Sequence, residues 1–237
     1  MKTALLLLLL CISGLPASAC TFAEFKRDSA GREAARAAFE ANDYAKTIVL
    51  FNKLLCKEGM AAMDKKKLLF AYARKGDAAG VAKTLRSIDI RYFAQNGDEL
   101  GIFDVYFDPL PAKYGAYKTE ARNRLQAFLD TVRGKPNFEY LRHEYLVDQA
   151  IRKNPSHDSL NYYGDWSAGQ KLQKQIQQSK DFYAYVKKNG LPTLGVAGNY
   201  PEMRITHDRS RFKYYLPLVI TSAEKGETDW RWWRTCR

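Results

Sequence analysis

The chain has 237 residues, of which 46% are hydrophobic and 27% are charged. This composition is typical of a packed globular protein with one or two domains, and it excludes a disordered chain, a collagen-like fibre and a polytopic membrane protein. Lysine and arginine number 38 against 26 aspartates and glutamates, which gives a net charge of +12 at pH 7. Basic surfaces bind nucleic acid, anionic lipid or anionic glycan. The basic residues are spread along the chain, however, and the run Lys65 to Lys67 is expected on a solvated helix face.

Residues 1–19 have the pattern of a secretory signal peptide. Lys2 supplies a positive start, an apolar run extends from Ala4 to Ile12, and small residues at Ala17 and Ala19 suit signal peptidase. The apolar run is about nine residues long, well short of the ~20 that cross a bilayer as a helix. We therefore expect an extracytoplasmic protein, either periplasmic or an outer-membrane lipoprotein, for which no nucleic-acid partner is predicted.

Three cysteines remain after the predicted leader: Cys20, Cys56 and Cys236. The small residues directly before Cys20 also resemble a bacterial lipoprotein box, which makes Cys20 a candidate for lipidation. Extracytoplasmic compartments favour disulfides, so a lipidated Cys20 would leave Cys56 and Cys236 as the natural pair. Alternatively, Cys56 is a small buried apolar residue in a helix. No two mature cysteines or histidines are closely spaced, so neither a metal site nor a cofactor is predicted.

From Ser29 to about Ile90, apolar residues recur at helical spacing, with turn signals at Asn42-Asp43 and Gly76-Asp77. These two turns are 34 residues apart, which is the period of the tetratricopeptide repeat. Residues 31–90 therefore resemble two such helix-turn-helix repeats. Two repeats bury little core by themselves, so we expect the helices that follow to cap them.

Residues 91–115 are rich in aromatic side chains, which we expect to pack on the neighbouring helices; the alternative is that they line a ligand groove. A helix is predicted from about Tyr117 to Val132, and Gly134 with Pro136 then marks a boundary. The predicted organisation is a signal peptide over 1–19, a tetratricopeptide-like helical region over 20–134 and a smaller helical domain over 135–237. The predicted fold class is all-α.

Helices are also expected over about 138–153, 167–188 and 211–225, with a glycine-rich turn between the last two. Several short motifs follow one another here, namely Asp148-Gln149-x-x-Arg152, Gly190-x-Pro192-Thr193, Val196-x-Gly198, His207, Tyr215-Leu216-Pro217, Ala223 and Gly226. In this order they resemble an uncharacterised family of bacterial proteins, a domain of unknown function often found behind tetratricopeptide-like helices. The resemblance implies no established reaction. Thr206 stands where the family usually has Gln, so a polar partner from that position would be absent.

The same motifs contain the candidate site. Asp148 and Arg152 are four residues apart and share a helix face, and Gln149 lies one step round. If His207 meets them, it would transfer a proton, Asp148 would orient it, and Arg152 with Gln149 would bind an anionic or carbonyl group. The alternative is a structural polar network that ties the glycine-rich turn to this helix.

The tail from Trp230 to Arg237 alternates tryptophan with arginine. Such a sequence can lie at a membrane interface or stack on sugars, but we expect a bridge at Cys236 to hold the indoles against the protein.

The leading functional hypothesis is a non-catalytic envelope protein whose helical array binds a protein or peptide. The alternative is an enzyme or small-molecule binder with its site at Asp148, Gln149, Arg152 and His207. Membrane contact is expected only through a lipid on Cys20 or through the tail.

Overall fold

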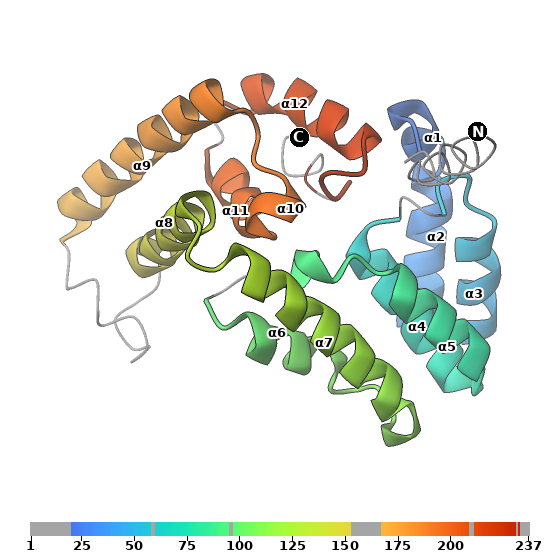
Figure 1. The fold of residues 1–237 in the computed structure, drawn as a ribbon. Helices are drawn as coiled ribbons and strands as arrows, with labels where there is room; N and C mark the ends of the chain where they lie inside the picture. Colours follow the sequence, from blue (N-terminus) through green and yellow to red (C-terminus); the bar gives the residue numbers. More distant parts are fainter. Residues whose placement is uncertain are drawn as a thin grey trace, which may run out of the picture.

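A computed structural model describes residues 20–57, 60–94, 97–152, 167–208, 211–230 and 232. Over these ranges the protein consists of twelve α-helices and two short 3₁₀ helices, without a strand (Figure 1). The all-α prediction is therefore confirmed. None of the helices in this part of the chain is long and apolar enough to cross a membrane.

The first helices are two packed pairs preceded by a short helix. The bounds are α1 Phe22–Arg27, α2 Ser29–Glu40, α3 Tyr44–Asn52, α4 Ala62–Lys75 and α5 Ala78–Ser87. Helix α2 packs on α3, α4 packs on α5, and α3 also contacts α4. The two predicted turns are confirmed, because Asn42 and Gly76 both adopt positive φ values, of 60° and 76°. Their assignment to tetratricopeptide repeats stays a prediction.

The predicted solvated face of the lysine run is wrong. The Lys65 side chain is buried and donates from Nζ to the carbonyl oxygen of Ser87 at 2.8 Å. The Lys66 ammonium lies 4.3 Å from the centre of the Tyr106 ring, where burial, followed by the Lys67 charge, lowers its pKa to about 8. Successive residues of a helix point in different directions. Because this helix is packed on more than one side, the three lysines cannot all lie on one solvent-exposed face.

The aromatic segment after α5 forms part of the core. It contains the 3₁₀ helices η1 Ile90–Phe93 and η2 Ala112–Tyr114 and the helix α6 Glu99–Phe107. Tyr92, Phe93, Phe103 and Phe107 are all buried. Phe93 and Phe107 lie with their ring centres 5.0 Å apart in an edge-to-face contact. These rings thus pack on neighbouring helices, as expected.

The remaining helices are α7 Gly115–Val132, α8 Pro136–Arg152, α9 Ala168–Asn189, α10 Leu194–Ala197, α11 Tyr200–His207 and α12 Phe212–Glu224. Ser167 and Gln170 form a capping box at the start of α9, which ends at Gly190 with φ 79°. The short helix α10 lies within the glycine-rich turn predicted from Gly190 to Gly198, and α11 follows this turn. One hydrophobic cluster extends from Ala62 to Trp232 and so includes residues on both sides of Gly134. In Figure 1 the chain curves round until α12 lies near α1.

Gly198 carries a testable packing constraint, because it joins α10 to α11 with φ 56° beside η1. A Cβ atom here would lie 2.5 Å from the Cβ of Ala94 and 2.8 Å from its carbonyl oxygen. We expect Gly198→Ala to lower the free energy of unfolding by about 2 to 4 kcal/mol, through backbone strain and overpacking. Urea unfolding measures this loss. Gly115→Ala is the control, since no atom lies within 4 Å of a Cβ there and its φ of −55° is helical; an equal loss in both variants would contradict the constraint.

Candidate functional site

The structure brings the two most distant candidates together. Asp148 lies on α8 and His207 is the last residue of α11, and the two helices pack on each other. The His207 Nδ1 atom is 2.6 Å from the Asp148 Oδ2 atom. The Asp148 side chain is completely buried, whereas that of His207 keeps 19% of its surface exposed. The pair therefore has a buried carboxylate and an imidazole that reaches the surface.

Arg204 is the residue that sequence reasoning missed. Its Nη1 atom is 2.6 Å from the Asp148 Oδ1 atom, and its side chain is only 3% exposed. Nη1 also lies 3.5 Å from Gln178 Oε1 on α9. Arg204 precedes His207 by three residues, so both extend from neighbouring positions on one helix face. That spacing was visible in the sequence, but it becomes a signal only once α11 is known to be a helix.

Gln149 and Arg152 are the other two candidates. Gln149 Nε2 lies 3.5 Å from Asp148 Oδ2, a long distance for a hydrogen bond. Arg152 ends α8, and its side chain lies outside the part of the chain that the structure describes. The described guanidinium partner of Asp148 is thus Arg204, and the expected role of Arg152 stays a prediction.

Glu144 adds a second carboxylate one helical turn before Asp148. Its Oε2 atom is buried and has no hydrogen-bond partner in the described ranges, and the same holds for Arg204 Nε. Burial is the largest influence on Glu144 and raises its pKa; the Arg204 charge opposes it, and the charges of Asp181 and Asp148 act in the same direction as burial. The cluster therefore holds two carboxyl groups in unlike environments. Asp148 is held in an ion pair, and Glu144 is biased towards its neutral form.

The chemistry of His207 follows from which ring nitrogen is engaged. A bond from Nδ1–H to the Asp148 carboxylate assigns the neutral tautomer that leaves the Nε2 lone pair unprotonated. No residue in the described segments hydrogen-bonds to Nε2. When a buried carboxylate holds one ring nitrogen of a histidine and the other makes no hydrogen bond, that second nitrogen can accept a proton, or accept a hydrogen bond from a ligand.

A neighbouring network is saturated and has a structural role. Asp208 accepts hydrogen bonds from Ser179 Oγ at 2.6 Å and from Tyr215 Oη at 2.8 Å. Arg211 Nη1 lies 3.0 Å from the same carboxylate. These contacts join α9, α11 and α12. They fix the end of the helix that carries His207.

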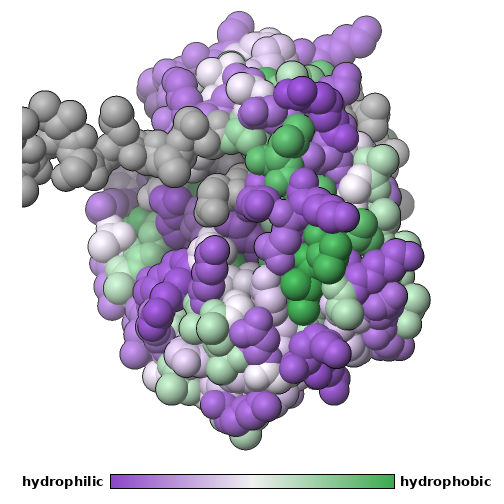
Figure 2. Space-filling view, turned by 90° about the vertical axis from the view of Figure 1, so that its right-hand side faces the viewer, coloured by the Kyte–Doolittle hydropathy of each residue, from purple (hydrophilic) through white to green (hydrophobic). Residues whose placement is uncertain are grey.

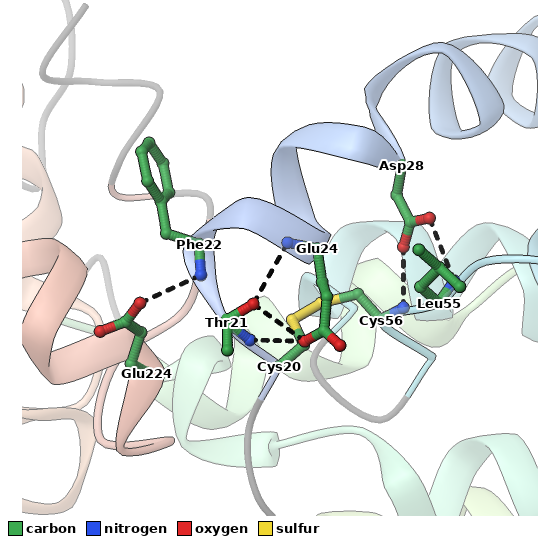
Figure 3. Close-up of a disulfide and its surroundings, with 8 residues drawn as sticks. All are labelled: Cys20, Thr21, Phe22, Glu24, Asp28, Leu55, Cys56 and Glu224. Atoms are coloured by element: carbon green, nitrogen blue, oxygen red, sulfur yellow. Dashed lines mark hydrogen bonds between the residues drawn. A yellow bond between two sulfur atoms is a disulfide. The ribbon is translucent and has the colours of Figure 1, made fainter.

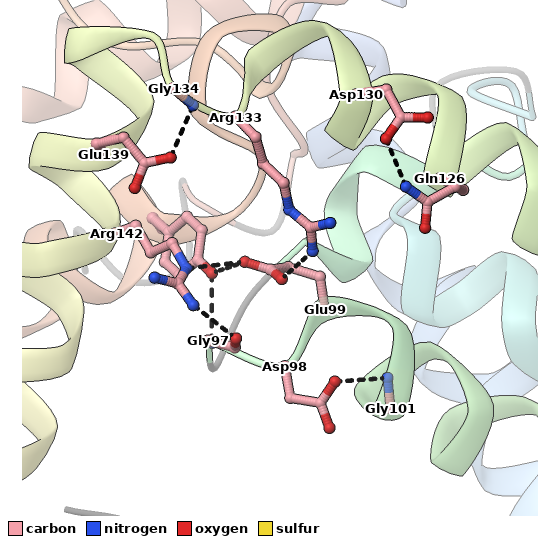
Figure 4. Close-up of polar contacts among 11 residues, drawn as sticks. Gly97, Asp98, Glu99, Gly101, Gln126, Asp130, Arg133, Gly134, Glu139 and Arg142 are labelled. Atoms are coloured by element: carbon pink, nitrogen blue, oxygen red, sulfur yellow. Dashed lines mark hydrogen bonds and ion pairs between the residues drawn. The ribbon is translucent and has the colours of Figure 1, made fainter.

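Another buried carboxylate, Glu99, lies elsewhere in the core (Figure 4). It accepts hydrogen bonds from the Tyr200 hydroxyl, from Arg133 Nη2 at 3.0 Å and from Arg142 Nε at 3.2 Å. Arg142 also donates to the carbonyl oxygen of Gly97 at 2.9 Å. The cluster joins α6, α8 and α11. We assign it to stability, because the described donors surround both carboxylate oxygens.

The cysteine pairing differs from the expected one. Cys56 is bonded to Cys20, with the Cα atoms 5.3 Å apart, and not to Cys236 (Figure 3). A sulfur atom forms a single disulfide, so the predicted Cys56–Cys236 bridge is wrong for this structure, and Cys236 itself lies outside the described residues. Asp28 positions the loop by accepting hydrogen bonds from the backbone N–H groups of Leu55 at 3.0 Å and Cys56 at 2.7 Å.

The tail places two of its indoles in the interior. Trp232 is completely buried and donates from Nε1 to Asn199 Oδ1 at 2.9 Å. Trp230 is 2% exposed and stacks on Phe25. The indoles are thus held against the protein by ring stacking and a hydrogen bond, whereas the sequence predicted that a bridge at Cys236 would hold them.

Comparison with family models, with curated proteins and with solved structures finds no match to this chain. The resemblance to the family of unknown function therefore rests on the motifs alone. In the described part of the chain, no group of three or more histidine, cysteine, aspartate or glutamate side chains is arranged to hold a metal ion.

Proposed function

We propose that the protein is an extracytoplasmic enzyme or small-molecule binder whose working group is the His207 imidazole. The observation that carries this proposal is the 2.6 Å contact between His207 Nδ1 and buried Asp148, with Nε2 unengaged among the described residues. In this arrangement Asp148 orients the ring, as the carboxylate does in other histidine-carboxylate pairs. Arg204 holds the other oxygen of Asp148 at 2.6 Å and so fixes the carboxylate in place.

Glu144 extends the proposal to a proton donor. Glu144 lies one helical turn before Asp148 on α8, and burial raises its pKa, so it is the carboxyl group of this region that we assign as proton donor beside the His207 base. Arg204, which the sequence did not single out, is paired with Asp148 and is not assigned to ligand binding. Recognition of an anionic or carbonyl group is therefore assigned to Gln149 and Arg152, as the sequence suggested.

The test uses the phenotype of a strain that lacks the protein. His207→Gln keeps a hydrogen-bond donor for Asp148 but removes proton exchange, so it is expected to lose the complementing activity by about a hundredfold or more. Thr206→Ala is the matched control, because Thr206 bonds to the carbonyl oxygen of Glu202 and lies outside the cluster. Thermal unfolding of both variants verifies folding. Full complementation by a folded His207→Gln variant would exclude proton transfer at this site.

The proposed location combines two features. Residues 1–19 have the pattern of a secretory leader, and the chain contains a disulfide between Cys20 and Cys56. Disulfides persist in oxidising compartments and are rare in reducing ones. Together these features favour a protein that acts outside the cytoplasm.

Binding of a protein or peptide partner by the paired helices is the second candidate. Its supporting observation is an incompletely covered apolar helix: α3 is apolar on several sides, with Val49 49% exposed and Leu55, just beyond its end, 62% exposed. Figure 2 views the side of the molecule that carries these helices and shows apolar patches among hydrophilic residues. Exposed apolar patches of this kind are a common feature of interaction surfaces. Tyr44 and Tyr72, on α3 and α4, are also partly exposed.

The same complementation assay separates the two candidates. Partner binding through this face predicts that the double variant Val49→Ser/Leu55→Ser loses activity while His207→Gln retains it. The opposite pattern supports the His207 site and excludes this face as the essential surface. Because both substituted residues are exposed, the double variant is expected to fold normally, and its melting temperature verifies this.

A further inference from the structure

The first residues after the predicted leader are built into the fold. Helix α1 begins at Phe22, two residues after Cys20, and the capping box between Thr21 and Glu24 starts it. The backbone N–H of Phe22 donates to Glu224 Oε1 at 3.1 Å, although the two residues are 202 positions apart in the sequence (Figure 3). Helix α1 therefore connects the beginning of the chain to the end of α12.

Aromatic stacking strengthens the same connection. The Phe25 ring lies 4.7 Å from the Trp230 ring at an interplanar angle of 12°, and Phe22 stacks on the same indole at 6.1 Å. Cys20, Phe25, Cys56, Ala223 and Trp230 form a separate buried cluster. Next to it, Asp229 Oδ2 accepts a hydrogen bond from the N–H of Ala62 at the start of α4. Three distant parts of the chain thus meet around the disulfide.

This geometry bears on the two chemical fates of Cys20. Lipidation joins a diacylglycerol to Sγ through a thioether, and a disulfide uses the same sulfur, so the two modifications exclude each other. Cys20 is 9% exposed within the cluster, and only Thr21 separates it from α1. If Cys20 carried a diacylglycerol whose acyl chains lay in a bilayer, a linker would be needed between Cys20 at the membrane surface and the folded domain. One intervening residue spans only about 3.5 Å.

We propose that Cys20 is joined to Cys56 and carries no lipid. The disulfide is then a covalent strap between the start of α1 and the segment that joins α3 to α4, and α1 in turn contacts the C-terminal segment through the hydrogen bond to Glu224 and the stacking on Trp230. The two thiols lose two electrons and two protons, which a disulfide-bearing oxidant of the compartment accepts by thiol-disulfide exchange as it becomes a dithiol. Because the sulfur of Cys20 is used by the disulfide, no lipid on Cys20 would anchor the protein, and we expect it to be released from the membrane after export. The inference depends on the predicted leader and is independent of the His207 site.

The test is the covalent state of the exported protein. The full chain with its own leader is produced in a bacterium with an outer membrane, and the protein is digested without reduction and analysed by mass spectrometry. We expect the Cys20 peptide, with a free α-amino group, linked to the Cys56 peptide. A diacylglycerol on Cys20, an uncleaved leader or a Cys56–Cys236 linkage would each overturn the proposal. A lipoprotein of the host, labelled with palmitate in the same cells, establishes that acylation is detectable.

Thermal unfolding provides an independent test of the strap. The disulfide closes a loop across 36 residues, and its loss is expected to lower the melting temperature by about 10 °C. Cys20→Ser and Cys56→Ser should give equal shifts, and the double variant should add nothing. Cys236→Ser is the control and should leave the melting temperature unchanged. A shift for Cys236→Ser but not for Cys20→Ser would show that the strap is not formed.

Discussion

Replacing Asp148 by alanine is expected to lower the free energy of unfolding by about 3 to 5 kcal/mol, the largest effect of any single substitution considered for this protein. The reason is the buried cation left behind. Arg204 is 3% exposed, and in this variant its Nη1 atom loses the carboxylate with which it is paired at 2.6 Å. Chemical denaturation followed by circular dichroism measures the loss.

Two further variants separate the charge effect from the loss of volume. Asp148→Asn has almost the same shape and can still accept hydrogen bonds, so its loss is attributable to charge. The combined variant Asp148→Leu/Arg204→Met removes both charges and is expected to recover most of the stability, because a buried ion pair can be replaced by apolar residues at little cost. If the combined variant were as unstable as Asp148→Ala, packing and not the unpaired charge would explain the loss.

Replacing Glu99 by alanine is expected to lower the free energy of unfolding by about 2 to 3 kcal/mol, because it leaves the buried Tyr200 hydroxyl and two guanidinium groups without their acceptor. The effect is smaller than at Asp148 because the cations can reach water: the Arg133 and Arg142 side chains are 46% and 34% exposed. Urea unfolding of this variant beside Asp148→Ala tests the order of the two effects.

The Glu99 cluster also predicts a pH dependence. Burial raises the pKa of Glu99, but the hydrogen bonds from Tyr200 and Arg133 and the charge of Arg142 outweigh it, so the folded-state pKa is lowered. A carboxyl group with a lowered pKa stabilises the fold fully above its unfolded pKa of about 4.3, and this stabilisation is lost as the pH falls through the folded value. The stability difference between the wild type and Glu99→Gln should therefore shrink below about pH 5. A constant difference down to pH 3 would show that the Glu99 charge does not contribute.

Local signals in the sequence were sufficient for the approximate bounds of α7, α8, α9 and α12 and for two turns. Asn42 and Gly76 marked those turns because turn residues tolerate positive φ. Each signal acts over four residues or fewer. None depends on what the helix packs against.

The candidate site was predicted in part. His207 and Asp148 were found from their motifs, and the structure places them together. Arg204 and Glu144 were missed because nothing local distinguishes them from surface residues. Their roles arise from burial between α8, α9 and α11, and burial of a charged side chain depends on residues far along the chain.

The sequence by itself determined the all-α class, the helices on either side of the two turns and the two most distant members of the site, because periodicity, turn chemistry and local spacing specify these features. Only the tertiary structure decided that Cys20 pairs with Cys56, that Arg204 holds Asp148, and that Asp229 caps α4 from 167 residues away. Each of these contacts joins groups whose proximity results from packing of the whole chain. The number of residues between two side chains does not predict whether they meet in space, because the turns and helices between them can be arranged in many ways.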